Sequence, residues 1–307
     1  MWSYTLRRLL ATIPTLLAVI TVSYLLVHAA PGGPFDSERV VSAAVLANLQ
    51  AKYHLDQPLW QQYLHYLGNL LQGDLGASFR YADWSVNELV ANALPVSLAI
   101  GGTALALSFV IGVGLGTAAA LRQNSAADYG VMLVGNLGSV VPSFVIGPVM
   151  ILVFALWLHW LPAGGWDAFA PRFMIMPVAL LTLINVATIA RVMRGSLIEV
   201  LHSNFIRTAR AKGLPTRVVV LRHALKPALL PVVSVLSPLA ISSITAALVT
   251  ETVFSLPGLG KLIVNGAGNR DYTLVLGLVV LITLLAVLLN LLVDLAYAAL
   301  DPKIRYS

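Results

Sequence analysis

Side chains that could do chemistry are scarce in this sequence, and their spacing matches no catalytic pattern. The 307 residues contain no cysteine, which excludes disulfides, cysteine nucleophiles and thiolate metal sites. The stretch SLPGLGKL at 255–262 approaches a nucleotide-binding loop, but it lacks the leading glycine and the Ser or Thr after the lysine. Neither HExxH nor GxSxG occurs. We therefore expect a chain that is not an enzyme and that itself binds no cofactor and no metal.

The densest group of cations lies in the stretch NFIRTARAKGL, residues 204–214. Asn204, or Ser203 before it, can cap a helix that starts at Phe205 and runs for about two turns to Lys212. Gly213 can then adopt the left-handed conformation that ends a helix, and the proline that follows at 215 blocks continuation. We expect a short, basic helix that stops at this glycine.

The faces of this short helix suggest what it binds. Helical spacing predicts that Leu201, Phe205, Thr208 and Ala209 share one face, while the cations point elsewhere. The cations could anchor the chain near anionic lipid, or they could bind a partner protein. A DNA-reading helix-turn-helix fits poorly, because uncharged apolar runs follow within a few residues of both ends, and we expect no nucleic-acid partner.

The elements that carry this helix are set by six runs without Asp, Glu, Lys or Arg. The chain is 58% hydrophobic, only 10% charged and has a mean hydropathy of +0.85. A helix needs about 20 apolar residues to cross a bilayer core of ~30 Å. The sequence predicts an all-α membrane protein with six transmembrane helices, in the runs 9–35, 89–121, 129–166, 173–190, 227–250 and 272–293.

These runs divide the chain. We expect an N-terminal segment with the first span at 1–30, a loop at 31–94, a five-helix core at 95–300 with a cytoplasmic loop at 191–227, and a tail at 301–307. The first run is longer than the 7–15 apolar residues of a signal peptide, so we expect it to be retained. Residues 57–73 are predicted to form an amphipathic helix that lies on the membrane or against a partner.

Charge predicts the orientation. Thirteen of the nineteen Lys and Arg residues fall in 1–8, 122–128, 191–227 and 301–307. The positive-inside rule places these segments, and so both termini, in the cytoplasm. The remaining loops, including 31–94, would face outward.

The predicted spans offer uncharged polar groups. Ion-coupled carriers usually hold carboxylates, His or Arg at membrane depth. Here Asp294 is the one candidate, and its place about 33 Å along the last run puts it at an interface. Small polar side chains could line a path for a neutral or zwitterionic solute: Thr182, Asn185, Thr188, Ser234, Ser237, Ser242, Ser243 and Thr245. Ordinary helix packing is the competing explanation. Gly112-x-x-x-Gly116 predicts a close helix contact.

Several stretches carry a family resemblance. Arg207-Thr208-Ala209-x-x-x-Gly213, with Leu225 twelve residues later, resembles the EAA loop of ABC importer permeases. Arg and Thr replace the first two residues of the general pattern, and Lys226 stands where proline is usual. The stretch RTARAKGL is closer to the peptide and nickel transporter branch. EVLHSNFIRTARAKGLP at 199–215 and the tail LDPKIRYS at 300–307 most resemble B-type permease subunits of bacterial oligopeptide importers.

The resemblance implies a type I ABC importer permease fold and a set of partners. These would be a second homologous permease in a heterodimer, two ABC ATPase subunits that bind ATP and Mg, an extracytoplasmic peptide-binding protein, a peptide substrate and the lipid of the bacterial cytoplasmic membrane. The ATPases would dock on a coupling helix comprising Asn204, Phe205, Arg207, Thr208, Ala209, Arg210, Ala211, Lys212, Gly213 and Leu214. Glu251 and Asp271 would face the binding protein.

Two kinds of alternative stay open. The same type of complex could carry dipeptides, glutathione or nickel. A stand-alone ion-coupled carrier or channel is the alternative from another class, and it would transport without ATPase subunits.

Overall fold

The computed structural model describes residues 2–30, 56–81 and 83–300, with the backbone alone described at 2–11, 134, 136–140, 244–246, 294 and 296–300. The predicted tail at 301–307 and the first part of the 31–94 loop, up to residue 55, lie outside this range. The described chain is helical and contains no strand. Its elements are α1 Trp2–Ala29, α3 Leu59–Leu71, α4 Val86–Leu121, α5 Ala126–Val140, α6 Ser143–Met150, η1 Ile151–Trp157, α7 Pro171–Leu201, α8 Asn204–Ala211, α9 Thr216–Val218, η2 Val219–Ala224, α10 Leu225–Val253, α11 Leu259–Gly268 and α12 Tyr272–Leu300.

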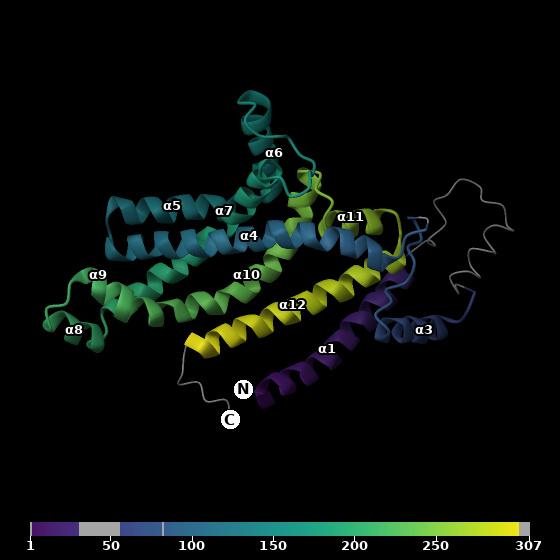
Figure 1. Ribbon diagram of the computed structural model, residues 1–307, viewed down its shortest axis with the longest axis horizontal. Helices are drawn as coiled ribbons and strands as arrows, with labels where there is room; N and C mark the ends of the chain where they lie inside the picture. Colours follow the sequence, from purple (N-terminus) through teal and green to yellow (C-terminus); the bar gives the residue numbers. More distant parts are fainter. Residues whose placement is uncertain (1, 31–55, 82, 301–307) are drawn as a thin grey trace.

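Five helical stretches in the described residues are long and apolar enough to cross a membrane, and they coincide with five of the six predicted runs. These stretches are Thr12–Ala29, Val86–Leu121, Pro171–Leu201, Thr216–Ser243 and Tyr272–Val293. The third predicted run is not one continuous helix. It breaks at Pro142 between α5 and α6, and α6 continues into the π-helical segment η1. Figure 1 shows α6 leaving the plane of its neighbours.

Proline explains this break. Pro142 has no N–H to donate to the preceding turn, and its ring disfavours helical geometry at the residue before it. Pro142 has a ψ of 141°, which belongs to extended backbone, and it directly precedes the first residue of α6. The third predicted run is therefore present as α5 and, at an angle to it, α6 with its continuation η1.

Helix α7 is the centre of the bundle, with α4, α5 and α10 packed on it (Figure 1). The predicted close contact at Gly112 and Gly116 is confirmed. A Cβ on Gly112 would lie 2.7 Å from Cβ of Ile189, and one on Gly116 would lie 2.6 Å from the carbonyl oxygen of Ala190. Only glycine at these two places lets α4 and α7 come this close.

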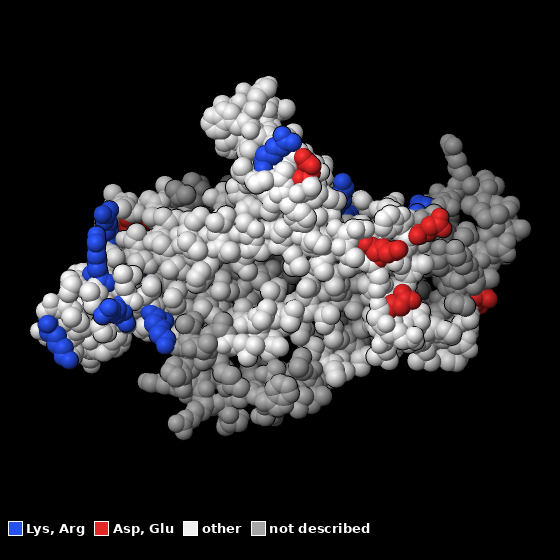
Figure 2. All heavy atoms as spheres, viewed as in Figure 1, with Lys and Arg blue, Asp and Glu red and all other residues white. Residues whose placement is uncertain are grey.

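The two ends of the bundle differ in charge. Figure 2 shows Lys and Arg side chains gathered at the end that carries α8 and α9, and Asp and Glu side chains at the opposite end. Helix α1 begins and α12 ends toward the α8 end (Figure 1). We refer to the α8 end as the basic end and to the opposite end, where α3 and α11 lie, as the acidic end.

Candidate functional site

The end of α8 is built as the sequence predicts. Gly213 has φ +76°. Its N–H donates to the carbonyl of Arg210 at 2.9 Å, and the N–H of Leu214 donates to the carbonyl of Ala209 at 3.4 Å. This pair of bonds is a Schellman motif, which satisfies carbonyls that a helix end otherwise leaves unpaired. Pro215 then starts the turn into α9.

The side chains that α8 buries are not the group that was predicted to share one face. Leu201 belongs to the end of α7, and Phe205 and Thr208 are exposed. Ile206, with 0% exposure, and Ala209 are the side chains that α8 buries. Of the residues predicted to share a face, only Ala209 is buried, because the turn after α7 directs Ile206 inward and leaves the ring of Phe205 outside.

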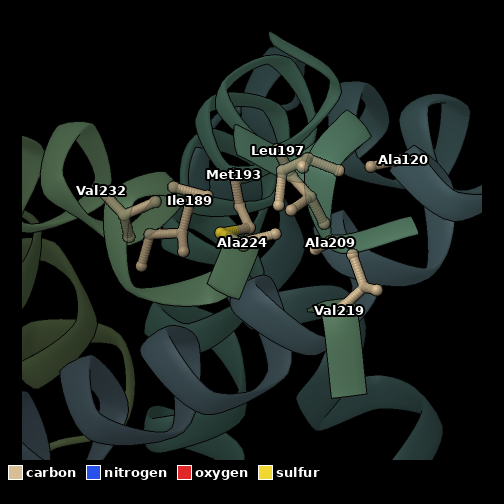
Figure 3. Packing of buried hydrophobic residues seen from close by; sticks show 10 residues of the cluster. Ala120, Ile189, Met193, Leu197, Ala209, Val219, Ala224 and Val232 are labelled. Atoms are coloured by element: carbon tan, nitrogen blue, oxygen red, sulfur yellow. The ribbon is translucent and has the colours of Figure 1, made fainter. Parts of the chain in front are cut away.

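Ile206 and Ala209 fill a cluster that we call the inner seat. Its buried members come from five elements: Ala120, Ile189, Met193, Leu197, Ile206, Ala209, Val219, Ala224, Ala228 and Val232. Figure 3 shows Met193, Leu197, Ala209 and Ala224 close together at the centre of this cluster, with Ala120, Ile189, Val219 and Val232 around them. Because protein interiors are close-packed, a displacement of α8 must move the helices of this seat or open a void among them.

The outward surface of α8 is basic with one aromatic side chain. Arg207, Arg210, Lys212 and Gly213 are exposed, as is Phe205 at 51%. An exposed aromatic ring beside Arg is a composition enriched in protein interfaces. The surface therefore suits a protein partner with an apolar pocket and acidic or carbonyl groups.

An ion pair joins α5 to α7 next to the inner seat. The guanidinium of Arg194 donates from Nε to Oδ1 of Asp128 at 2.5 Å and from its terminal amine to Oδ2 at 2.6 Å. The Asp128 side chain is 1% exposed and that of Arg194 26%. The hydrogen bonds from Arg194 hold the pKa of Asp128 below its usual range. Arg194 directly follows Met193, so this pair ties α5 to the wall of the seat.

The small polar side chains predicted to line a path do not converge. Thr182, Asn185, Ser237 and Ser243 are buried between helices, while Ser234 and Ser242 are exposed and donate to carbonyls of their own helix. Asn185 donates to Oγ of Ser243 at 2.8 Å, and Ser237 donates to Asn290. Thr188 is half-buried, and the side chain of Thr245 lies outside the described residues. Within the described chain these groups chiefly bond helices together.

A cavity of about 310 Å³ lies between α4, α10, α11 and α12. Its wall is almost wholly aliphatic, with Ser97, Ser243 and Glu251 as its polar members. Ser243 is the one side chain of the predicted path that lines it. In the described chain no group of three or more His, Cys, Asp or Glu residues is placed to hold a metal ion.

Glu251 joins three helices at the acidic end. Ser97 of α4 donates to its Oε1 at 2.5 Å, and the N–H of Gly260, in the first turn of α11, donates to its Oε2 at 2.7 Å. Ser97 also accepts the N–H of Leu259 at 2.9 Å. A carboxylate at a helix N-terminus satisfies free N–H groups and complements the helix dipole. Glu251 thus fastens α4, α10 and α11.

Asp271 makes a second junction at that end. Ser78 donates to its Oδ2, and the N–H groups of Phe79, at 3.1 Å, and of Leu274, at 3.2 Å, donate to its Oδ1. Asp271 therefore caps the start of α12 and holds the loop that follows α3.

These two junctions correct the prediction that Glu251 and Asp271 face a binding protein. Both residues are 0% exposed, and their carboxylates are occupied by hydrogen bonds inside the chain. The reason is local. Each carboxylate accepts hydrogen bonds from N–H groups at the start of a helix, which have no partner within that helix.

Sequence reasoning missed four partners that make these sites. No sequence motif pointed to these residues, because each one contributes through a contact with a residue that is distant in sequence. They are Ile206, Asp128, Ser97 and Ser78. Asp128 could have been found as the one acid of the 122–128 segment, with cations, including Arg194, in the 191–227 loop predicted on the same side. The serines carry no such mark.

Comparisons with known proteins agree along the whole chain. The family described as "Binding-protein-dependent transport system inner membrane component" matches residues 112–306, and its N-terminal counterpart matches residues 1–100. The oligopeptide transport system permease protein OppB of Haemophilus influenzae is 55% identical over 100% of both chains. That of Escherichia coli is 54% identical, also over 100% of both. The dipeptide transport system permease protein DppB of Bacillus subtilis is 39% identical over 98% of this chain and 97% of that one.

A solved structure shares the fold. An inward-facing form of the MetNI methionine ABC transporter superposes with a TM-score of 0.60 at 20% identity, covering 69% of this chain and 96% of the other. The similarity at this identity concerns the fold, and it supports the predicted type I importer architecture. With both family matches and full-length relatives above 50% identity, the chain belongs to the inner-membrane components of binding-protein-dependent transport systems.

Proposed function

We propose that this chain is a membrane-spanning permease subunit of an ABC importer that moves oligopeptides into the cytoplasm. Its partners would be a second permease in a heterodimer, two ATPase subunits that hydrolyse ATP with Mg, and an extracytoplasmic peptide-binding protein. The basic end would lie in the cytoplasm together with both termini, as the positive-inside rule requires. The full-length relatives at 54–55% identity support oligopeptides as the substrate over dipeptides, whose permease is 39% identical.

One observation carries the proposal. Helix α8 presents cations and Phe205 outward while its other face fills the inner seat, and α7, which walls that seat, packs on α4, α5 and α10. A partner that binds α8 and moves it would therefore also move α7 and the helices packed against α7. ATP-driven movement of the ATPases would reach the helices by rigid-body rocking of packed elements. This chain would hold the peptide path and none of the catalytic groups.

The test reverses one outward charge of α8 in the complete complex. Arg210→Glu should weaken ATPase binding and lower ATP-driven oligopeptide uptake into proteoliposomes. Arg270→Glu, an exposed cation at the opposite, acidic end, is the matched control and should leave ATPase binding unchanged. Equal effects of the two variants would contradict docking at α8. Competition of labelled oligopeptide uptake by dipeptides, glutathione and nickel separates the substrate alternatives.

A further inference from the structure

Helix α3 carries an exposed apolar stripe that no described residue covers. Trp60 is 62% exposed, Leu64 56% and Leu71 90%. At 100° per residue these three side chains fall within about 40° of one another. The helix contains no Asp, Glu, Lys or Arg, and none of its residues is fully buried. We call these three residues the α3 stripe.

The rest of α3 divides into two other sectors. Tyr63 and Tyr66 lie on one side of the stripe and face α1. Gln61 and Gln72 lie about 100° around the helix on the other side, while His65 lines a small pocket with Tyr66 and with Tyr24 of α1. The helix therefore has a protein-facing, an apolar exposed and a polar sector, which is one sector more than a helix between protein and water requires.

Helix α3 is docked on the last turns of α1 through Thr21 and Tyr24, and neighbouring side chains on these turns are apolar and exposed. Tyr63 shares a hydrogen bond of 2.6 Å with Thr21, and the ring of Tyr24 lies 5.1 Å from that of Tyr63. Thr21 and Tyr24 precede the end of α1 by roughly 8–12 Å at 1.5 Å per residue. On the same turns of α1, three side chains are exposed at 54–65%: Val22, Leu25 and Leu26.

We propose that the α3 stripe contacts the acyl chains of the bilayer leaflet at the acidic end. The stripe is apolar and exposed like Val22, Leu25 and Leu26 of α1, a candidate membrane span, and the contact of Tyr63 with Thr21 holds α3 beside that span. Tryptophan and leucine without a charge suit the boundary between headgroups and acyl chains. A reversible protein contact would carry more polar groups than this stripe offers. The polar sector then faces away from the lipid, and α3 anchors the loop that follows it, up to the start of α4.

The absence of native cysteine makes a direct test simple. Leu64→Cys and Leu71→Cys are made singly, and each cysteine is labelled with a nitroxide spin label. The labelled chain is studied in the complete complex in lipid nanodiscs, with other subunits that contain no reactive cysteine. Gln72→Cys, next to Leu71 at the same depth but in the polar sector, is the matched control. Collision rates with lipid-soluble oxygen and with a water-soluble nickel chelate are measured for each label. This readout involves no transport, so it is independent of the proposed function.

Lipid contact predicts that labels at 64 and 71 collide severalfold more with oxygen than with the chelate, and that the label at 72 shows the reverse preference. Three results would overturn the proposal. Chelate-accessible labels at 64 and 71 would place the stripe in water. Labels that lose chelate access only when the binding protein is added would make it a docking surface for that protein. Labels shielded from both reagents would mean that another subunit covers it.

Discussion

Gly213 sets the end of α8 through its backbone, not through space. Its φ is +76°, and a Cβ added there would meet nothing within 4 Å. Left-handed backbone costs most residues about 1–2 kcal/mol, and asparagine tolerates it better. Gly213→Val should therefore lower ATP-driven uptake strongly, while Gly213→Asn, which also adds a Cβ, should keep most of it.

The measurement is peptide uptake divided by the amount of assembled complex, and the amount of ATPase subunit that co-purifies with the chain gives that amount. If the valine variant transported like the asparagine variant, the left-handed turn would not be what shapes the docking surface.

Gly258 and Glu251 are predicted to be energetically coupled. A Cβ on Gly258 would lie 2.3 Å from the carboxyl carbon of Glu251, and its three nearest atoms all belong to that carboxyl group. The φ of −102° at Gly258 suits alanine, so the obstacle is the carboxylate alone. Gly258→Ala should destabilise the wild-type chain by about 1–3 kcal/mol, as overpacking does, and should cost much less in a Glu251→Ala background.

A double-mutant cycle on unfolding in detergent measures this coupling. Strictly additive effects of the two substitutions would contradict the described junction of α4, α10 and α11.

At the scale of elements, substitution of two glycines of α4 should have different effects, because only one of them lies in the contact with α7. Gly116→Leu would place atoms against Ala190 and Met193, whereas Gly114→Leu adds its side chain on an exposed face with nothing within 4 Å. The first should lower the melting temperature and the yield of assembled complex, and the second should leave both near wild type. Similar losses for both variants would mean that α4 and α7 do not pack at Gly116.

The ion pair between α5 and α7 gives a pH prediction. The folded-state pKa of Asp128 is lowered by Arg194, so the pair stabilises the fold above the usual aspartate pKa of about 3.9. That stability is lost as the pH falls through the lowered value. Asp128→Asn should therefore reduce thermal stability at pH 5–8 by a roughly constant amount, and the difference from wild type should shrink below about pH 4.

Asp167→Asn is the control for that series. Asp167 pairs with Arg172 at 3.4 Å with both side chains at least 60% exposed, and exposed pairs contribute little. A loss at Asp167 as large as that at Asp128 would show that the α5–α7 link has no special weight.

The elements were largely predictable because their signals are local. Charge-free runs gave the long helices, Gly213 and Pro215 gave the end of α8, and Gly112 and Gly116 gave a close helix contact. Pro142 lay in the third run, but a proline alone does not predict a break, because α7 continues through Pro177 and α10 through Pro231 and Pro238. The buried face of α8 was missed for a similar reason, because the turn at His202 and Ser203 decides which side of the helix meets the inner seat.

At the scale of the whole molecule, different interactions hold the helices together at the two ends. The basic end is held by the apolar inner seat and by one ion pair, while the acidic end is held by Glu251 and Asp271, each bonded to backbone N–H groups. Sequence could not separate such carboxylates from surface acids, because Glu251 and Asp271 both lie beside the ends of apolar runs, where exposed acids are also common. Only the fold reveals the helix starts that they satisfy.

The central claim is that this chain holds no energy source and receives it through α8. The most direct measurement compares peptide accumulation in proteoliposomes that contain this chain alone with those that contain the complete complex, with and without ATP. We predict accumulation only for the complete complex with ATP, and its loss in the Gly213→Val complex. Accumulation of oligopeptide against a gradient by the chain alone, with no nucleotide hydrolysed, would contradict the account.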